Sequence, residues 1–305
     1  MERVVITGPT GGIGIFLIKK FIDKGISVTA ICRPQSQRIG NIPKNELVDI
    51  IECDLSELDQ LIGKVQPADV FYHMAWDGTF GRSRNDMHTQ IGNLSACIKA
   101  VQLASSLKCK KFVGVGSTNE YGDINAKKRP DMSCNPNNGY GIMKYCAGKM
   151  AAVESERLGL EYNWCRIGSA YGPYTAMHTL VSGALSKILK GERVQFTKGE
   201  QRWSFIYNED VANALYLVGL RGKDKATYNV AGSESDELKN YIIQMRDMVN
   251  PTLEIGIGEI PYYENQVFNI EADISSLMTD TGYIPQYTFE EGIKETIKWI
   301  ESRET

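Results

Sequence analysis

The chain has 305 residues, of which 42% are hydrophobic and 23% charged, so it can bury a substantial core in one large or two smaller domains. Its formal net charge of -3 offers no basic field, and we expect neither nucleic acid nor a membrane surface as a partner. The seven cysteines are odd in number and never stand in C-x-x-C spacing, and the three histidines share no metal-ligand spacing. These counts argue against a disulfide framework and against a metal site.

The amino-terminal stretch "MERVVITG" enters a strand pattern at once, without the charged segment and long apolar segment of a secretory signal. No apolar run approaches the roughly 20 residues that span a bilayer. Cytoplasmic residence is therefore the expectation.

Short apolar runs alternate with helical patterns along the first half of the chain. The runs lack polar alternation, which is typical of strands covered by helices on both faces. They predict a Rossmann-type α/β fold with a doubly wound parallel sheet. The predicted strands are "RVVITG" (3–8), "SVTAIC" (27–32), "VDIIEC" (48–53), "ADVFYHMA" (68–75) and "KFVGVGS" (111–117), and the first helices are predicted over 13–24 and 90–107.

The pattern loosens after "YNWCRIGSAYGP" (162–173) into loops, short strands and helices. We therefore predict a sheet domain over residues 1–170 and a smaller, substrate-binding lobe over 171–305. The amphipathic helix "IYNEDVANALYLVGL" (206–220) is expected to return to the sheet domain, which residues 206–232 would rejoin, so the lobe is discontinuous.

A glycine-rich loop, "VVITGPTGGIG" (4–14), joins the first strand to the first helix. In such a loop the first glycine permits the turn, the second lets the backbone approach a pyrophosphate, and the third lets the helix pack closely on the strand. The anion would lie on the helix amino terminus. The alternative is a glycine-rich turn without a ligand. We expect cofactor contacts from Gly8, Thr10, Gly11, Gly12, Ile13 and Gly14.

The second strand ends in "ICRPQSQR", where a site for NAD would usually place an acidic residue on the ribose 2'-hydroxyl. Arg33 stands there instead, with Arg38 close behind. A guanidinium can pair bidentately with a 2'-phosphate, whereas a carboxylate would repel it. The sequence thus favours NADP(H). NAD remains open if Arg33 and Arg38 are solvated loop charges.

Tyr140 and Lys144 stand four residues apart on a predicted helix, so their side chains share a face. The ammonium of Lys144 would favour the phenolate of Tyr140 and lower its pKa toward the range of useful proton transfer. Ser117, at the end of a predicted strand, supplies a hydroxyl that can bond the same substrate oxygen. The spacing alone is also typical of an ordinary surface helix.

The G-x-x-G-x-x-G loop together with "YGIMK" (140–144) resembles the short-chain dehydrogenase/reductase superfamily. The resemblance covers nearly the whole chain and narrows to the extended branch, the NAD(P)-dependent nucleotide-sugar epimerases, dehydratases and reductases. The segments that carry it are "GSTNEYGD" (116–123), "GYGIMK" (139–144), "RIGSAYGP" (166–173), "QRWSFIYNEDVANAL" (201–215) and "YNVAGSES" (228–235).

This resemblance implies Ser117, Tyr140 and Lys144 as the catalytic residues. It implies further cofactor contacts near adenine from Asp54 and Leu55, near the adenine ribose from Ala75, and beside the nicotinamide from Ile167 and Ser169. Arg202 matches an arginine that grips the substrate diphosphate. Many relatives carry a second such arginine, but "YYENQVFNIEADISSL" (262–277) has none, which leaves Arg82, Arg84 and Lys187 as weaker candidates.

The loop "HMAWDGTFGRSRND" (73–86) follows the fourth strand and is expected to contact the substrate. The alternative is a surface loop anchored by Trp76. A 4,6-dehydratase would need an Asp-Glu pair after Ser117, but only one acidic residue stands there. The expected substrate contacts are Trp76, Thr118, Asn119, Glu120 and Arg202.

The epimerases, dehydratases and reductases of this family share one chemistry, which is hydride transfer between the nicotinamide and a sugar carbon. An epimerase returns its hydride and keeps NAD, whereas a reductase exchanges its cofactor and draws on NADPH. Arg33 favours a reductase of a nucleotide 4-keto-sugar. The alternative is an NAD-dependent nucleotide-sugar epimerase, and the minor alternatives are a 4,6-dehydratase and a non-catalytic NADP-binding regulator.

The resemblance also implies a homodimer, because the helix after the fourth strand and the Tyr-Lys helix often form a four-helix interface in this family. The small and apolar residues of "NLSACIKAVQLASSL" (93–107) suit such packing, but they would equally suit a core helix of a monomer.

Overall fold

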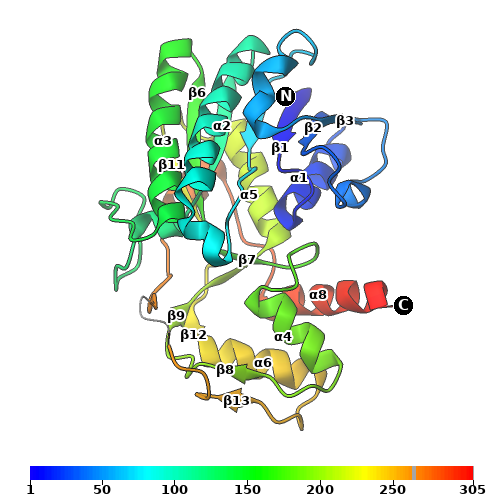
Figure 1. The fold of residues 1–305 in the computed structure, drawn as a ribbon, viewed down its shortest axis with the longest axis vertical. Helices are drawn as coiled ribbons and strands as arrows, with labels where there is room; N and C mark the ends of the chain where they lie inside the picture. Colours follow the sequence, from blue (N-terminus) through cyan, green and yellow to red (C-terminus); the bar gives the residue numbers. More distant parts are fainter. Residues whose placement is uncertain (263–265, 305) are drawn as a thin grey trace.

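Seven parallel strands form the central sheet of this computed structural model, which describes residues 1–262 and 266–304. The order of the strands reverses between β1 and β4, and the carboxyl ends of strands at such a switch point are where open α/β sheets bind ligands. The predicted fold class is confirmed. In spatial order the strands are β11 (Thr227–Val230), β6 (Glu161–Ile167), β5 (Lys111–Ser117), β4 (Val70–His73), β1 (Arg3–Thr7), β2 (Ser27–Cys32) and β3 (Val48–Glu52) (Figure 1).

Helices cover both faces of this sheet. Successive side chains of a strand point to opposite faces, and in β1 Val4 and Ile6 join one buried cluster while Val5 joins another. Both faces are therefore apolar, as the uninterrupted apolar runs predicted. The first cluster includes residues of α1 (Gly12–Asp23), α5 (Asn208–Arg221) and α7 (Ser275–Thr281), and the second includes residues of α2 (Met87–Ser106) and α3 (Gly139–Leu158).

A smaller lobe lies beyond the carboxyl ends of the strands (Figure 1). Its core gathers aromatic and aliphatic side chains that include Tyr171, Leu185, Ile242 and Ile293. The lobe contains α4 (Leu180–Leu189), α6 (Leu238–Val249), α8 (Phe289–Glu304), the pair β8 (Gln195–Phe196) with β13 (Gly256–Ile257), and the pair β9 (Arg202–Trp203) with β12 (Asp236–Glu237). Near the sheet domain, β7 (Ser169–Tyr171) pairs with β10 (Phe205–Tyr207).

The second half of the chain contributes to both parts. β11 forms the edge of the large sheet beside β6, and α5 packs against α1. The short helix α7 packs against α5 and β11, although it falls within the range that we assigned to the lobe. Residues 275–281 therefore pack against the sheet domain as well.

Short 3-10 helices lie in the connections between these elements. η4 follows β5 directly, and η3 lies in the loop between β4 and α2. No helix within the described residues is both long and apolar enough to cross a membrane. In the described part of the chain these 3-10 helices are η1 (Ile39–Asn41), η2 (Leu55–Leu61), η3 (Gly81–Asn85) and η4 (Thr118–Tyr121).

Candidate active site

The glycine loop turns sharply from β1 into α1. Gly8 has a φ of +73°, and a Cβ at this position would lie 2.7 Å from the backbone nitrogen of Ala75, just after β4. A Cβ at Gly14 would lie 2.6 Å from the carbonyl oxygen of Gly8. Both are closer than real Cβ contacts, so only glycine lets the turn, the helix and the end of β4 pack together.

Gly11 differs from these two positions. A Cβ built there meets no atom of the described residues within 4 Å, so open space lies beside it. Gly11 is the N-cap of α1, and no described side chain caps that end of the helix. The first N–H groups of a helix have no intrahelical partner, and together with the helix dipole they form an anion site. These residues therefore fit the pyrophosphate of a dinucleotide.

Two of the expected adenosine contacts follow the carboxyl ends of β2 and β3. Arg33 follows β2, and its Nη1 lies 3.5 Å from Oδ1 of Asp77, with about two-thirds of each side chain exposed. Such an exposed pair is weak, so it constrains the guanidinium little. Asp54 follows β3 and accepts hydrogen bonds from the backbone and hydroxyl of Ser56, which hold its pKa below the usual value.

Leu55, Arg38 and Ala75 were also expected to contact the cofactor. Leu55 packs, partly buried, against the cluster under α2, and Arg38 is exposed at the start of η1. Ala75 donates its backbone N–H to the hydroxyl of Thr7 at 3.4 Å, which ties the ends of β4 and β1 together.

Ser117, Tyr140 and Lys144 meet at the carboxyl end of β5. Ser117 ends the strand, and its hydroxyl lies near the side chain of Tyr140, from the first turn of α3. Lys144, one turn further along α3, donates from Nζ to the carbonyl oxygen of Val115 at 2.6 Å. This Nζ lies 6.0 Å from the centre of the Tyr140 ring. Ile167 pairs with Ser117 across the sheet, and so lies beside this group.

The protonation of these groups differs from our expectation. Burial raises the pKa of Tyr140, and it outweighs the lowering by the Ser117 hydroxyl and by the charge of Arg84. Burial also lowers the pKa of Lys144 from 10.5 to about 8. Without a cofactor, the protein therefore does not lower the pKa of Tyr140 as we expected from Lys144. The reason is that desolvation penalises both the phenolate of Tyr140 and the ammonium of Lys144.

Trp76 lies against Tyr140 and Lys144 of α3. The ring centre is 3.9 Å from Nζ of Lys144, a cation–π contact, and the ring meets that of Tyr140 edge to face at 6.2 Å. Its indole N–H donates to Oε1 of Gln90 at 2.9 Å. Gln90 and Asn93 of α2 have buried side-chain amides. These amides also donate hydrogen bonds to backbone carbonyls of the loop before η3 and of η3 itself. The role of these two amides was not predicted from the sequence; their positions on one helix face were the available signal.

Two polar side chains complete this cluster. Arg84, from η3, places its Cζ 4.9 Å from the centre of the Tyr140 ring and donates from Nη2 to Oδ1 of Asn119 at 2.7 Å. Asn119 in turn donates from Nδ2 to the Ser117 hydroxyl at 3.1 Å. Thr118, which lies between Ser117 and Asn119 in the sequence, is buried.

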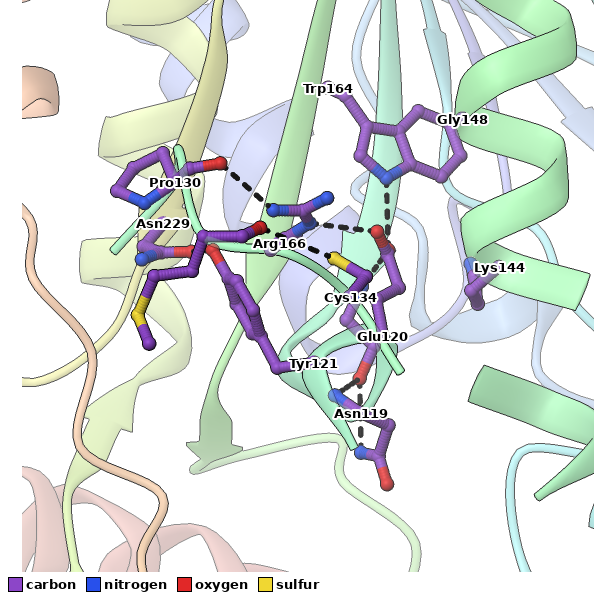
Figure 2. A network of polar contacts seen from close by, with 12 residues as sticks. Asn119, Glu120, Tyr121, Pro130, Cys134, Lys144, Gly148, Trp164, Arg166 and Asn229 are labelled. Carbon is purple, nitrogen blue, oxygen red and sulfur yellow. Dashed lines mark hydrogen bonds and ion pairs between the residues drawn. The ribbon is translucent and has the colours of Figure 1, made fainter. Parts of the chain in front are cut away.

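Glu120, an expected substrate contact, is held by hydrogen bonds from other residues of the protein. It is fully buried, and its Oε1 accepts from the Ser117 backbone at 2.8 Å and from the Trp164 indole at 2.9 Å. Its Oε2 accepts from Nε of Arg166 at 2.8 Å. Figure 2 shows the carboxylate between Trp164 and Arg166. The turn of η4 closes a capping box with Ser117, and the Glu120 carboxylate points into the protein, where these donors hold it.

Two further expected contacts, Arg202 and Ser169, come from short strands that follow β6. Arg202, in β9, donates to the hydroxyl of Ser235 at 2.7 Å and lies 3.4 Å from Oε1 of Glu271, with about half of its side chain exposed. Ser169 is half-buried in β7. The arginine-free segment over 262–277 lies partly outside the described residues, because it includes 263–265.

Comparison with known families agrees with this arrangement. The model of the NAD dependent epimerase/dehydratase family matches residues 4–231, about three-quarters of the chain. The chain belongs to this family. The resemblance drawn from the sequence motifs is thereby confirmed.

Members of this epimerase/dehydratase family are similar to the chain over almost its full length. The dTDP-glucose 4,6-dehydratase of Haemophilus influenzae is 23% identical over 334 residues, which cover 98% of each chain. Among solved structures, the UDP-glucose 4-epimerase of Thermotoga maritima, with UDP-glucose, has a TM-score of 0.91 at 20% identity and covers 99% of this chain and 100% of its own. The UDP-glucuronic acid 4-epimerase of Bacillus cereus, in complex with UDP-glucuronic acid and NAD, has a TM-score of 0.86 at 19% identity and covers 99% of each chain.

Proposed function

We propose that the protein is an NADP(H)-dependent oxidoreductase of nucleotide-activated sugars that reduces a 4-keto group, with Tyr140 as the proton donor. The observation that carries this proposal is the meeting of Ser117, Tyr140 and Lys144 at the carboxyl end of β5. The glycine loop opens at the same edge of the sheet. The family relatives supply the substrate class, because the similar proteins are named for nucleotide sugars.

A nicotinamide cofactor, when bound, supplies the hydride. The hydroxyls of Ser117 and Tyr140 would both bond the carbonyl oxygen of the sugar, and the Tyr140 phenol would give it a proton as the alcohol forms. Lys144, which the Val115 carbonyl and the Trp76 ring hold in place, would bond the cofactor ribose. Gly8, Gly11 and the amino terminus of α1 would hold the cofactor phosphates.

Arg33 supports NADP(H) over NAD. Its guanidinium is exposed and only weakly paired with Asp77, so it can turn to a 2'-phosphate. The second candidate is an NAD-dependent nucleotide-sugar epimerase, which the family description and the NAD complex of a similar epimerase favour. In that case Arg33 would remain a surface charge.

Two minor alternatives have less support. A 4,6-dehydratase needs acidic groups beside the sugar, but Glu120 is buried and bonded to Trp164 and Arg166. A non-catalytic NADP-binding regulator has no use for the proton-transfer residues, which are nonetheless assembled.

A homodimer through α2 and α3 is part of the proposal. Both helices expose large apolar side chains, among them Ile91, Met150 and Val153. Exposed apolar patches on paired helices are typical of interfaces. Sedimentation velocity on the full chain measures the state directly: a monomer at micromolar concentration would refute it.

The choice of reaction and cofactor can be tested together. The purified protein is incubated with nucleotide 4-keto-6-deoxysugars and NADPH, and separately with nucleotide hexoses and NAD. Consumption of NADPH with the keto-sugar is expected. Interconversion of hexose epimers without net cofactor turnover would establish the epimerase instead.

Arg33→Ala tests the cofactor assignment. Because a hydrogen bond to a charged group contributes about 1.5–3 kcal/mol, the Kd of NADPH should rise roughly 10- to 100-fold, and that of NADH much less. Fluorescence titration measures both constants. Arg38→Ala, in the same loop, is the comparison variant. Equal losses for the two cofactors in Arg33→Ala would defeat the preference for NADP(H).

A further inference from the structure

Two cations lie near the ring of the proposed proton donor, and the closer is not the lysine of the sequence motif. The Cζ atom of Arg84 lies 4.9 Å from the centre of the Tyr140 ring, whereas Nζ of Lys144 lies 6.0 Å away. Arg84 comes from η3, more than fifty residues before Tyr140 in the chain. Its place over the ring therefore depends on tertiary packing.

Arg84 also reaches the second proton-handling group. Its Nη2 donates to Oδ1 of Asn119 at 2.7 Å, and Nδ2 of Asn119 donates to the Ser117 hydroxyl at 3.1 Å. An amide bonded at both ends in this way cannot turn without losing a charge-assisted hydrogen bond. The Ser117 oxygen thus accepts from Asn119, which directs its own proton elsewhere.

The backbone around Arg84 is fastened to the start of α3. Asn85 accepts the backbone N–H of Gly139 at 2.8 Å, and Gln90 donates to the carbonyl oxygen of Ser83 at 3.0 Å. A Cβ at Gly139 would lie 2.9 Å from the Arg84 carbonyl oxygen, so only glycine allows η3 to approach this closely. Gly139 immediately precedes Tyr140, and the two segments are held together at this point.

We propose that Arg84 is a positioning residue for proton transfer, which stabilises the phenolate form of Tyr140 from above its ring and orients the Ser117 hydroxyl through Asn119. The inference rests on the proposed role of Tyr140 as the proton donor. It assigns to Arg84 a task different from the diphosphate contact considered from the sequence.

Two other charged groups of the described residues lie near Tyr140, and neither is a cation at the pH where an ordinary phenol ionises. Lys144, on the same helix, is buried, and its pKa is lowered to about 8, so it has lost its charge there. Glu120, from η4, raises the pKa of Tyr140 but is paired with Arg166. A guanidinium stays charged at any pH at which proteins fold. Arg84 is therefore the permanent cation beside the tyrosine, and its charge lowers the pKa that burial raises.

The chemical consequence concerns the charge that develops on Tyr140. During reduction the proton passes from the phenol to the sugar oxygen, and the electron pair stays on the tyrosine as phenolate. During oxidation the phenolate takes the proton back. A fixed cation at the place where this charge develops makes the phenol a stronger acid, and it also raises the fraction of phenolate present at a given pH. Loss of Arg84 should therefore weaken proton donation to the sugar oxygen during reduction.

The test places 3,5-difluorotyrosine at position 140 of the full chain, because fluorination lowers the phenol pKa into a range where the fold persists. The 19F chemical shift then reports its ionisation as the pH is raised. Arg84→Gln should raise this pKa by about one pH unit, the lower end of what an opposite charge within 4–6 Å produces. Arg84→Lys, which keeps a charge but loses the planar contact, should give a smaller rise.

Arg82→Gln is the matched control, since Arg82 belongs to the same 3-10 helix and is exposed. It should leave the titration unchanged. Circular dichroism of each variant reports folding, and Arg84→Lys keeps the test decisive if Arg84→Gln does not fold. A titration that Arg84→Gln and Arg84→Lys leave unchanged overturns the role of Arg84.

A second readout separates this inference from the proposed function. The pH profile of kcat/KM for Arg84→Gln should move by the same amount as the 19F titration. Failure of the wild-type protein to turn over any nucleotide sugar would overturn the proposed function. The 19F titration would still decide whether Arg84 sets the ionisation of Tyr140.

Discussion

At the scale of one residue, the burial of the Lys144 ammonium lowers the stability of the fold. Only 3% of the residue is exposed, and its pKa falls from 10.5 to about 8 because burial penalises the ammonium. The folded protein thus binds fewer protons than the unfolded chain between pH 8 and 10.5. Stability should therefore rise with pH across this window, and the full penalty is present below pH 8.

Lys144→Met should accordingly stabilise the protein at pH 7 while abolishing turnover. The pKa difference from 10.5 to about 8 corresponds to about 3 kcal/mol in the free energy of unfolding. The gain over wild type should shrink as the pH rises from 8 toward 10.5, as urea unfolding at several pH values would show. Lys149→Met, on an exposed position of the same helix, should change little. A Lys144→Met variant less stable than wild type at pH 7 would contradict this reading.

At the scale of elements, the end of β5 is held by a buried ion pair rather than by apolar packing alone. Glu120 of η4 bonds Arg166 of β6, and the Trp164 ring lies over the glycines of β5. A Cβ at Gly116 would lie 2.2 Å from both Oε1 of Glu120 and Nε1 of Trp164. The glycines of "KFVGVGS" therefore make room for the group that fixes Ser117.

Glu120→Gln should destabilise the fold rather than alter the chemistry. Removal of one partner of a buried ion pair leaves the other charge uncompensated, at a cost of about 3–5 kcal/mol. Thermal unfolding should show the loss, and the double variant Glu120→Leu with Arg166→Met should recover most of it. Glu156→Gln, which breaks an exposed pair with Lys225, should cost less than about 1 kcal/mol. Unchanged stability in Glu120→Gln would show that the pair is not structural.

The sequence predicts these elements better than it predicts their side-chain contacts. Uninterrupted apolar runs identified five of the seven sheet strands, since both faces of the sheet are buried. The direction of Glu120 could not be read, because it depends on how η4 turns after the strand. A signal was present in Arg166, a charge within the apolar strand "YNWCRIG", which requires a buried partner.

At the scale of the whole molecule, the candidate site draws on two parts of the chain. The glycine loop and the three proposed catalytic residues belong to the sheet domain, and Arg202 belongs to the lobe. A substrate gripped by both would bridge the two parts. The position of η3 over Tyr140 was not predictable, because it depends on Asn85, Gln90 and Gly139, which come from three separate elements.

Tyr140→Phe tests the central claim most directly, because it removes one hydroxyl and keeps the ring between Trp76 and Arg84. Cofactor affinity, measured by calorimetry, should stay close to that of wild type. Turnover of the nucleotide 4-keto-sugar should fall by about 10²- to 10⁴-fold, the contribution of a positioned acid or base. A variant that turns over at the wild-type rate would show that Tyr140 is not the proton donor.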